Sequence, residues 1–418
     1  MGMYIINGGN RLDGELHIEG SKNAVLPILA ASIINGRQSV IHNVPYLKDV
    51  KTMIDVLETI GCTCSFEGDT VIVNSVGDLD INIPEKPVRE MRSSIILMGV
   101  MLGRFKKVKI SFPGGCEIGL RPIDLHLTGL RLLGAKIVES HGYILCECDK
   151  LYGNEIHLDY PSVGATENIM LAAVSAEGVT IIQNAAREPE IVDLQNFLNK
   201  MGAKITGAGS STIKIEGVKK FHDAEHTVIP DRIVAGTYSV AAAITQGRIV
   251  IRDIIPEHIK PILLKLEESG CKINRYDSDI VISSSGRHNA IDIIKTMPYP
   301  GFPTDMQAQM MALMCTAKGT SIFIETIFEN RYKHAEELIK MGADIKIEGR
   351  AAIVKGVNNL MGAHVFSKDL RGGAALVLAA LAADGTTIVD NVDTHIERGY
   401  ENMDLKLKSL GADITKEK

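Results

Sequence analysis

The sequence has no run of lysine and arginine longer than two residues, and acidic residues outnumber basic ones by 51 to 45. A formal net charge of −6 argues against a general nucleic-acid-binding protein, which would show a basic excess. The longest apolar runs, such as AALVLAALAA, reach about a dozen residues, below the roughly 18 that indicate a membrane-spanning helix. The first residues, MGMYIINGGNRLDG, match neither a secretory signal nor a myristoylation start. We therefore expect a cytoplasmic protein that binds neither nucleic acid nor membranes.

Metal-binding and nucleotide-binding patterns are also absent. The seven cysteines are an odd number in a long chain, which fits reduced thiols better than a disulfide framework. Cys62 with Cys64, and Cys146 with Cys148, lie two apart in alternating segments, and without CxxC or spaced histidines we favour packing over metal binding. No GxGxxG, GxxxxGK[ST], HExxH or Asp-rich loop occurs in a suitable context. We expect chemistry without a metal or redox cofactor.

What the chain does contain is a phrase repeated six times, in the copies LETIGCTC, LRLLGAKI, LNKMGAKI, LEESGCKI, LIKMGADI and LKSLGADI. Each copy is typical of a helix that ends at a C′ glycine and is followed by a strand. These glycines are Gly61, Gly134, Gly202, Gly270, Gly342 and Gly411. Before each copy comes an apolar helix, a glycine and a β-branched strand, with the glycines Gly36, Gly103, Gly178, Gly247, Gly319 and Gly385. Six units of about 70 residues account for the chain.

Units of this length exceed the stacked repeats of solenoids, so we predict two compact α/β domains of three units each. The first domain is predicted to span residues 22–229, and the second to combine residues 1–21 with 230–418. The boundary falls at the polar, proline-containing stretch FHDAEHTVIPDR. Small-molecule sites favour domain clefts, so we expect the active site between the two domains.

The second unit is longer than the others, and the excess lies at PGGCEIG. The spacing between its two glycines is 31 residues, against 23 to 26 in the other five units. Irregular loops on a repetitive scaffold tend to be functional, so we predict that Cys116 is exposed and reactive. A lone cysteine elsewhere would more often be buried filler.

Cations cluster at the starts of the predicted helices. A helix N-terminus carries partial positive charge, so a cation there is unfavourable by ~0.3–1 kcal/mol, and its repetition suggests a bound anion. The helix starts carry Lys22, Arg92, Arg232, Lys368 and Arg371, and the loops before the second helices carry Arg121, Arg187, Arg331 and Arg398. The alternative is a set of solvated surface cations paired with Glu188, Glu190, Glu329 and Glu397.

The motifs SKNAVLPILAA, PGGCEIGLRPIDLH, SVGATENIMLAA, AAREPEIVDL, FPTDMQAQ, IFENRYKH and DLRGGAALVLAAL closely resemble the UDP-N-acetylglucosamine 1-carboxyvinyltransferase family. The resemblance runs in order from about residue 3 to residue 413. It implies a two-domain inside-out α/β barrel built from six βαβαββ units. It also implies transfer of the enolpyruvyl group of phosphoenolpyruvate to the 3′-hydroxyl of UDP-N-acetylglucosamine with release of phosphate, at the start of peptidoglycan precursor synthesis.

The resemblance also implies roles for individual residues. The phosphoenolpyruvate contacts would be Lys22, Asn23, Arg92, Arg121, Arg371 and Arg398. The UDP-sugar contacts would be Asn23, Arg92, Arg121, Pro122, Ile123, Asp124, Leu125, Ser162, Val163, Gly164, Asp305 and Ile327. Tyr160 and Pro161 replace a Lys-Val pair of some family members, so Tyr160 is placed at the UDP group with less support.

The implied reaction needs an acid at the methylene carbon of the donor, a base at the sugar hydroxyl and fixed cations for phosphate and carboxylate. Addition gives a tetrahedral intermediate, and loss of phosphate and a proton restores the double bond. Cys116 would supply the acid or add covalently, and Asp305 is the best candidate for the base. Lys22 and Arg398 complete the predicted catalytic set.

Two other functions are compatible with parts of the sequence. The sister reaction on shikimate 3-phosphate uses the same fold, but the cysteine loop and the SKNA motif argue against it. A silent UDP-sugar-binding regulator would not need Lys22, Cys116, Asp305 and Arg398 together. The expected partners are small-molecule substrates, with a monomer or a weak homo-oligomer as the assembly.

Overall fold

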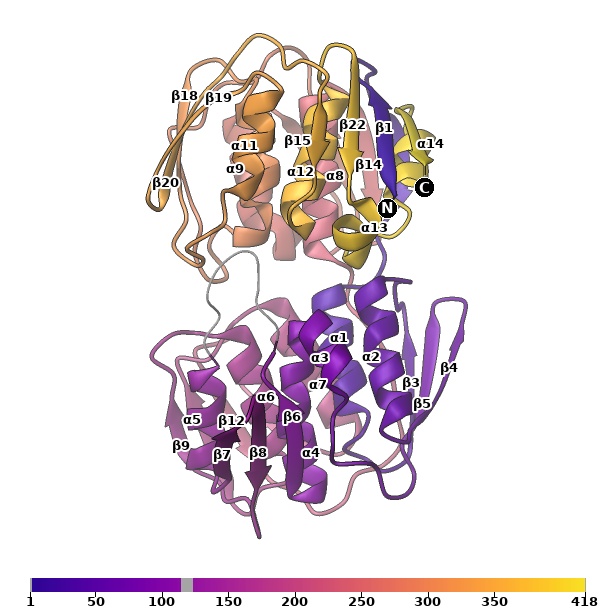
Figure 1. Cartoon of the computed structure of the whole chain (residues 1–418), viewed down its shortest axis with the longest axis vertical. Coiled ribbons are helices and arrows are strands. Elements are labelled where there is room, and N and C mark those ends of the chain that lie inside the picture. The colour runs from indigo at the N-terminus through magenta and orange to yellow at the C-terminus, as the bar shows by residue number, and fades with distance from the viewer. Residues whose placement is uncertain (1, 114–122, 418) are drawn as a thin grey trace. The chain divides into compact units, whose positions relative to one another are not determined.

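The computed structural model describes residues 2–113 and 123–417, and these divide into two compact units (Figure 1). The N-terminal unit comprises residues 20–113 and 123–229, and the C-terminal unit comprises residues 2–19 and 230–417. Each unit has its own hydrophobic core.

The N-terminal unit has three sheets, with strand orders β13-β3-β5-β4, β6-β8-β7 and β9-β10-β12-β11. Its helices are α1 (Lys22–Ala31), α2 (Lys48–Thr59), α3 (Glu85–Glu90), α4 (Leu97–Phe105), α5 (Asp124–Leu132), α6 (Val163–Ala173) and α7 (Pro189–Lys200), with the 3-10 turn η1 (Arg92–Ile96). Its strands are β3 (Gln38–His42), β4 (Thr63–Glu67), β5 (Thr70–Asn74), β6 (Lys107–Ser111), β7 (Lys136–Ser140), β8 (Tyr143–Glu147), β9 (Glu155–His157), β10 (Val179–Gln183), β11 (Lys204–Thr206), β12 (Thr212–Glu216) and β13 (Ala224–Thr227).

The C-terminal unit repeats this plan with strand orders β2-β14-β16-β15, β17-β18-β20-β19 and β21-β22-β1-β23. Its helices are α8 (Arg232–Ile244), α9 (Lys260–Glu268), α10 (Gln307–Met314), α11 (Lys333–Lys340), α12 (Leu370–Leu381), α13 (Val392–His395) and α14 (Met403–Ser409), with the 3-10 turns η2 (Pro256–Ile259), η3 (Thr304–Met306) and η4 (Ile396–Arg398). Its strands are β1 (Met3–Asn7), β2 (Asp13–His17), β14 (Arg248–Arg252), β15 (Lys272–Arg275), β16 (Ile280–Ser283), β17 (Ile293–Lys295), β18 (Thr320–Ile324), β19 (Asp344–Glu348), β20 (Ala351–Lys355), β21 (His364–Phe366), β22 (Thr386–Asp390) and β23 (Asp413–Glu417).

Each predicted repeat forms one small sheet, usually with one parallel and two antiparallel strand pairs. In the fourth repeat, for example, β14 pairs in parallel with β2 and antiparallel with β16. Strand β1 lies between β22 and β23, so the start of the chain completes the sheet of the last repeat. Strand β13, from the polar stretch at the predicted boundary, pairs in parallel with β3 of the first repeat. That stretch is therefore an ordered part of the N-terminal unit.

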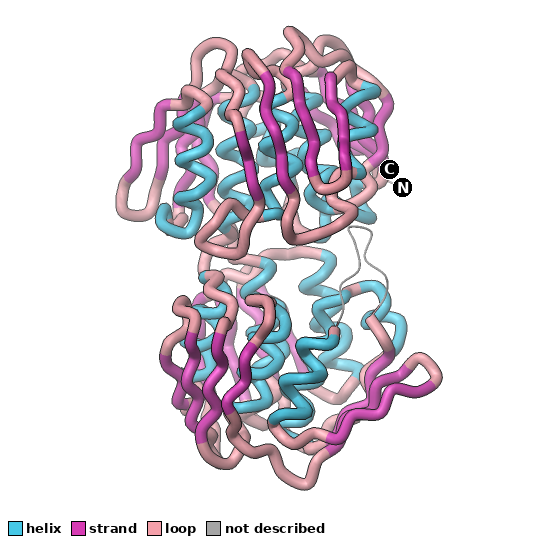
Figure 2. The backbone as a smooth tube through the Cα atoms, turned by 90° about the vertical axis from the view of Figure 1, so that its left-hand side faces the viewer, coloured by secondary structure: helices cyan, strands magenta, loops and turns pink. Residues whose placement is uncertain are grey.

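Helices occupy the inside of each unit and the sheets cover its outside (Figure 2). In the C-terminal unit, every residue of α10 is buried, and so is every residue of α8 and α12 after the first. Helices α1, α4 and α6 are buried almost as completely in the N-terminal unit. A helix that is apolar on all sides belongs in a core, which explains why the alanine-rich helices are central.

The six C′ glycines predicted from the repeated phrase all have left-handed backbones, with φ between 92° and 114°. The other six glycines, which precede the β-branched strands, are less uniform in backbone conformation. In the second and fourth repeats the left-handed residues are Lys106 and Gln246, with φ of 61° and 53°. Gly103 instead lies inside α4, and a Cβ on Gly247 would lie 2.1 Å from the carbonyl oxygen of Leu12. These two glycines are needed for close packing, not for the turn.

The cysteines of the described residues are all free, and none lies in a metal cluster of that part of the chain. Burial raises the pKa of Cys62 to about 11 and that of Cys146 to about 12, so both are poor nucleophiles. Among the helices described here, none has the length and apolar character needed to cross a membrane.

Candidate active site

Asp305 is held by two buried arginines of the C-terminal unit. Its Oδ1 accepts a hydrogen bond from Nη2 of Arg331 at 2.8 Å. Its Oδ2 accepts from Nε and Nη2 of Arg371 at 3.3 and 3.2 Å. The side chains of Arg331 and Arg371 are 4% and 3% exposed, whereas Asp305 keeps 27% of its surface accessible. The arrangement fixes a partly accessible carboxylate between two cations from different repeats.

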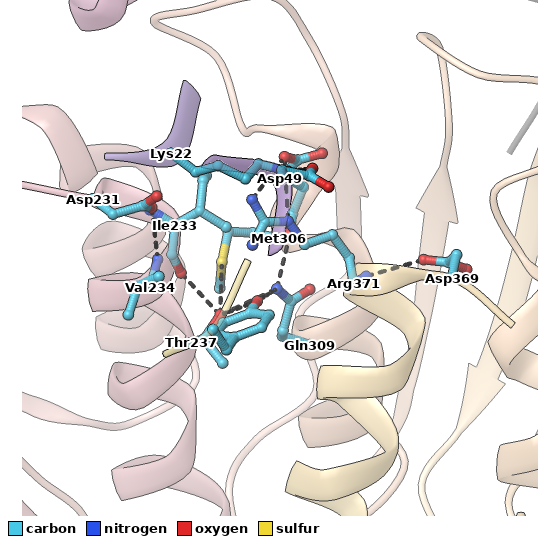
Figure 3. Close-up of polar contacts among 12 residues, drawn as sticks. Lys22, Asp49, Asp231, Ile233, Val234, Thr237, Met306, Gln309, Asp369 and Arg371 are labelled. Atoms are coloured by element: carbon cyan, nitrogen blue, oxygen red, sulfur yellow. Dashed lines mark hydrogen bonds and ion pairs between the residues drawn. The ribbon is translucent and has the colours of Figure 1, made fainter. Parts of the chain in front are cut away.

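Arg371 is placed by the start of α12. The carboxylate of Asp369 caps this helix and accepts from the backbone N–H groups of Arg371 and Gly372 at 3.0 and 2.8 Å. Figure 3 shows the contact between Asp369 and Arg371. The Arg371 guanidinium lies 5.3 Å from the ring centre of Tyr400. Burial by itself lowers the pKa of Arg371, but Tyr400 and the carboxylates of Asp305 and Asp231 outweigh it and raise that pKa above its usual value. Arg371 is therefore a permanent cation.

A polar network beneath Asp305 links α8, α10 and the segment that follows η4 in the C-terminal unit. Nε2 of Gln309 donates to the backbone oxygen of Asp305 at 2.8 Å and to Oγ1 of Thr237 and the hydroxyl of Tyr400, both at 3.2 Å. Thr237 and Tyr400 are themselves 3.0 Å apart through their hydroxyl oxygens. In Figure 3, Thr237 on α8 and Gln309 on α10 point toward one another. This network fixes the short turn η3 that carries Asp305.

Glu325 fixes the segment that contains Ile327. Its Oε1 accepts from the backbone N–H groups of Ile327 and Phe328 at 2.8 and 3.2 Å, and its Oε2 accepts from the hydroxyl of Thr304 at 2.9 Å. Because Thr304 precedes Asp305, one buried carboxylate positions both predicted UDP-sugar contacts. Arg398 ends η4 and is half-buried.

In the N-terminal unit, Lys22 is the first residue of α1 and forms an ion pair with Asp49 on α2. Its Nζ lies 3.3 Å from Oδ2 of Asp49, and both side chains are largely buried, at 12% and 7% exposed. Asn23 follows it and is half-buried. A buried lysine with its ammonium held near a helix start is a suitable contact for an anion.

Arg92 begins η1, close to a buried histidine that the sequence did not single out. His126, on α5, has its pKa lowered to about 4, first by burial and then by the charge of Arg92. Its Nδ1 lies 3.0 Å from Nδ2 of Asn168, and the Asn168 side chain also bonds to the backbone of Ile95 at 3.0 Å. A Cβ on Gly164 would lie 3.0 Å from the His126 ring, so a larger residue there would crowd the ring.

The remaining predicted UDP-sugar contacts of this unit lie at two helix starts. Ser162 caps α6 by accepting from the N–H of Ala165 at 3.3 Å, and Val163 and Gly164 form the first turn of that helix. Asp124 and Leu125 begin α5, and Ile123 precedes it. Tyr160 lies two residues before the α6 cap and is 40% exposed. Cys116, Arg121 and Pro122 lie outside the described residues.

The surface-pairing alternative for the cations is partly wrong. Glu329 pairs with Arg350 and Glu397 pairs with Lys416, so neither pairs with the arginines first considered. Arg331 and Arg371 are buried and pair with Asp305 instead. Sequence reasoning noted Arg331 as a loop cation but left it out of the site, and it missed Asp49, His126 and Glu325. The equivalent positions of the six repeats held the only signal for Arg331.

The chain resembles known proteins along nearly its whole length. A sequence model of the EPSP synthase family, described as 3-phosphoshikimate 1-carboxyvinyltransferase, matches residues 6–407. The chain is 58% identical over 416 residues to UDP-N-acetylglucosamine 1-carboxyvinyltransferase 2 of Caldanaerobacter subterraneus subsp. tengcongensis, with 100% of both chains covered. It is 51% identical to the protein of that name from Clostridium tetani, with 99% of both covered.

Solved structures show the same fold. The enolpyruvyl transferase NikO from Streptomyces tendae superposes with a TM-score of 0.90 at 23% identity, over 99% of this chain and 98% of that one. EPSP synthase from Acinetobacter baumannii superposes with a TM-score of 0.76 at 18% identity, over 100% of both chains. The predicted two-domain α/β fold is confirmed. The chain belongs to the EPSP synthase family and, within it, to the UDP-N-acetylglucosamine 1-carboxyvinyltransferases.

Proposed function

We infer that this protein transfers the enolpyruvyl group of phosphoenolpyruvate to the 3′-hydroxyl of UDP-N-acetylglucosamine and releases phosphate. The observation that carries this inference is full-length identity of 58% to a transferase named for that acceptor. The carboxylate of Asp305, fixed between two buried guanidiniums, also supports this inference because the reaction needs a base. The product is the first committed precursor of peptidoglycan.

Cations would hold the donor. The resemblance assigns Lys22, Asn23, Arg92, Arg121, Arg371 and Arg398 to phosphoenolpyruvate. Planar guanidiniums suit bidentate contact with carboxylate and phosphate, and a lysine supplies a point charge. Fixed cations in a site of low dielectric stabilise the charge that develops on the leaving phosphate.

Asp305 would accept the proton of the sugar hydroxyl, and Cys116 would protonate the methylene carbon of the donor. Protonation makes the adjacent carbon electrophilic, and the sugar oxygen attacks it to form a tetrahedral phosphate-bearing intermediate. Loss of phosphate and of the added proton restores the carbon–carbon double bond. The guanidiniums of Arg331 and Arg371 orient Asp305 for the first step.

The UDP-sugar would contact the starts of α5 and α6, with Asp305 and Ile327. Ser162, Val163 and Gly164 present a capped helix N-terminus, which suits a diphosphate. Tyr160 is exposed enough to meet the nucleotide. The net charge of −6 argues against nucleic acid as a partner. We propose a cytoplasmic enzyme of small molecules that works as a monomer or weak homo-oligomer.

One assay tests this function. Phosphate release from phosphoenolpyruvate is measured with UDP-N-acetylglucosamine and with shikimate 3-phosphate offered separately, each with and without a chelator. We expect release only with the UDP-sugar, unaffected by the chelator. Turnover with shikimate 3-phosphate would contradict the proposal and favour the sister reaction. Binding of the UDP-sugar without turnover of either acceptor would also contradict it and favour a silent regulator.

A further inference from the structure

Arg287 closes one end of the C-terminal unit by binding a cluster of backbone carbonyl groups. Its guanidinium donates to the carbonyl oxygens of Thr316 at 2.8 Å, Ala317 at 2.9 Å, Val357 at 2.8 Å and Gly356 at 3.2 Å. Its Nη1 also donates to Oδ1 of Asn358 at 2.7 Å. Four acceptors that follow α10 and β20 are thereby satisfied by one side chain.

The N-terminal unit repeats the backbone of this carbonyl cluster. Gly217 N–H donates to Gly178 at 3.0 Å, as Gly356 N–H does to Gly319. A Cβ on Gly217 would lie 1.6 Å from the carbonyl oxygen of Ala176, and one on Gly356 would lie 1.8 Å from that of Ala317. The carbonyls equivalent to the four that Arg287 binds are therefore those of Ser175, Ala176, Gly217 and Val218.

The side chains that fill the site in one unit are replaced in the other. The backbone N–H of Glu177 donates to Leu151 just as that of Lys318 donates to His288, so Lys150 is equivalent to Arg287. Because Val218 is equivalent to Val357, the next residues, Lys219 and Asn358, are also equivalent. Lys150 does not turn toward the carbonyls, because its Nζ pairs with Glu177 at 2.9 Å, with both side chains about half exposed. Within the described residues, no hydrogen bond to the four equivalent carbonyls is found.

A hollow of about 480 Å³ remains at this place in the N-terminal unit. Its lining includes the four residues of the carbonyl cluster together with Arg104, Lys106 and Lys219. The volume is within the usual range for small-molecule sites, about 300–1,000 Å³. Acceptor groups and cations therefore face one concave space.

The three cations of the hollow form no ion pair among the residues that the structure describes. Arg104 donates to the carbonyl oxygens of Ile33 and Gly77, at 2.6 and 2.7 Å, and Lys106 to that of Gly103 at 2.7 Å. Burial lowers the pKa of both groups, and the nearby charges of Asp78 at Arg104 and Glu177 at Lys106 offset this only in part. Glu177 also lines the hollow, and its carboxylate is paired with Lys150.

We propose that this hollow is a second ligand site, which binds a small organic phosphate whose hydroxyl groups donate to the carbonyl cluster. The phosphate lies against Arg104, Lys106 and Lys219, and the hydroxyl groups replace the donors that Arg287 supplies in the other unit. The site is independent of the residues assigned to the transfer reaction.

The test compares the native protein with a variant that restores the arginine plug, Lys150→Arg with Lys219→Asn. Glucose 6-phosphate is the probe, with glucose and inorganic phosphate as separate ligands, and binding is measured by calorimetry. We expect glucose 6-phosphate to bind the native protein more tightly than either simpler ligand. The plug variant should lose that binding and melt at a higher temperature, because the guanidinium fills the hollow.

Two further variants keep the test decisive. Lys106→Gln should weaken the probe about tenfold, the usual effect of losing one charge-assisted contact. Lys355→Asn, an exposed change in the C-terminal unit with the same loss of charge, should leave binding unchanged. Unaltered affinity in a folded plug variant, or equal affinity for glucose or inorganic phosphate alone, would overturn the proposal. Transfer activity should be unchanged in all three variants.

Discussion

Arg371 reaches Asp305 with two nitrogens on one oxygen, Oδ2, at 3.3 and 3.2 Å, while Arg331 holds the other oxygen at 2.8 Å. The Arg371 distances lie at the upper limit of the usual range for N–H···O hydrogen bonds and just beyond it. Oδ2 is therefore the less firmly held oxygen, and we expect it to be the one that accepts a proton. Arg331 acts as the positioning residue that fixes the carboxylate.

Removing the Arg331 contact should lower the rate without abolishing substrate binding. We expect Arg331→Gln to reduce kcat about 10- to 100-fold, because one charge-assisted hydrogen bond to a partly buried carboxylate is lost. The dissociation constant of the UDP-sugar should change much less. Arg350→Gln, at the exposed pair with Glu329, is the matched control. An equal loss in both variants would show that Arg331 has only a structural role.

Lys22 should matter for the donor more than for folding. Neutralising it in Lys22→Gln should cost ~2–4 kcal/mol in kcat/KM for phosphoenolpyruvate, as expected for a charged contact in a closed site. Asp49→Asn should have a smaller effect in the same direction, since Asp49 holds the Lys22 ammonium at 3.3 Å. Lys51→Gln, exposed on α2, should be neutral. Unchanged kcat/KM in a folded Lys22→Gln variant would remove Lys22 from the site.

Buried His126 should make the protein sensitive to acid. Its pKa is lowered to about 4 in the folded state, whereas an unfolded histidine titrates near its ordinary 6.5. As the pH falls, the unfolded chain binds this proton before the folded protein does. The contribution of neutral His126 to the free energy of unfolding is therefore present above pH 6.5 and is lost as the pH falls toward 4. Between pH 7 and pH 5 we expect a loss of about 2 kcal/mol from this residue.

His126→Gln should remove that part of the acid sensitivity, as measured by urea unfolding at the two pH values. His334 keeps its own contribution, since burial also lowers its pKa to about 4. The exposed His157→Gln is the control and should retain the full pH dependence. The same pH dependence in His126→Gln as in the native protein would refute this explanation.

Cys116 lies outside the described residues, so its prediction depends on the sequence. If Cys116 is an acid, Cys116→Asp should keep activity, because a carboxyl group also carries a proton. The family resemblance implies that the epoxide antibiotic fosfomycin mimics phosphoenolpyruvate and modifies this thiol, so Cys116→Asp should also resist fosfomycin. Cys116→Ala should lose most turnover. Activity and fosfomycin inactivation are measured together in the three proteins. Greater activity in Ala than in Asp would mean that Cys116 is filler.

Much of the fold was predictable because each repeat carries its own signal. The six C′ glycines have the left-handed backbone that their pattern requires. The all-apolar helices, such as α12, are central because no face of them suits water. The left-handed backbone of Lys106, in the turn after α4 of the second repeat, was not predictable, since lysine has no sequence signal for that conformation.

Less of the candidate site could be predicted from the sequence, because its key contacts join distant parts of the chain. Arg371 and Asp305 are 66 residues apart and meet through the packing of two repeats. Asp49 and Glu325 look like ordinary surface acids in sequence, yet both are buried. His126 lies in an amphipathic helix, where a lone histidine is most often a core residue. Residue type alone suggested the cations of the candidate site but not the groups that hold them.

The central claim is that Asp305 is the base of the transfer reaction, and Asp305→Asn tests it most directly. The amide keeps the shape but cannot take the hydroxyl proton, so we expect kcat for phosphate release to fall about 100-fold or more. Calorimetry should show that the UDP-sugar still binds, and the exposed Asp384→Asn should behave as the native protein. Turnover of Asp305→Asn within tenfold of the native rate would contradict the account.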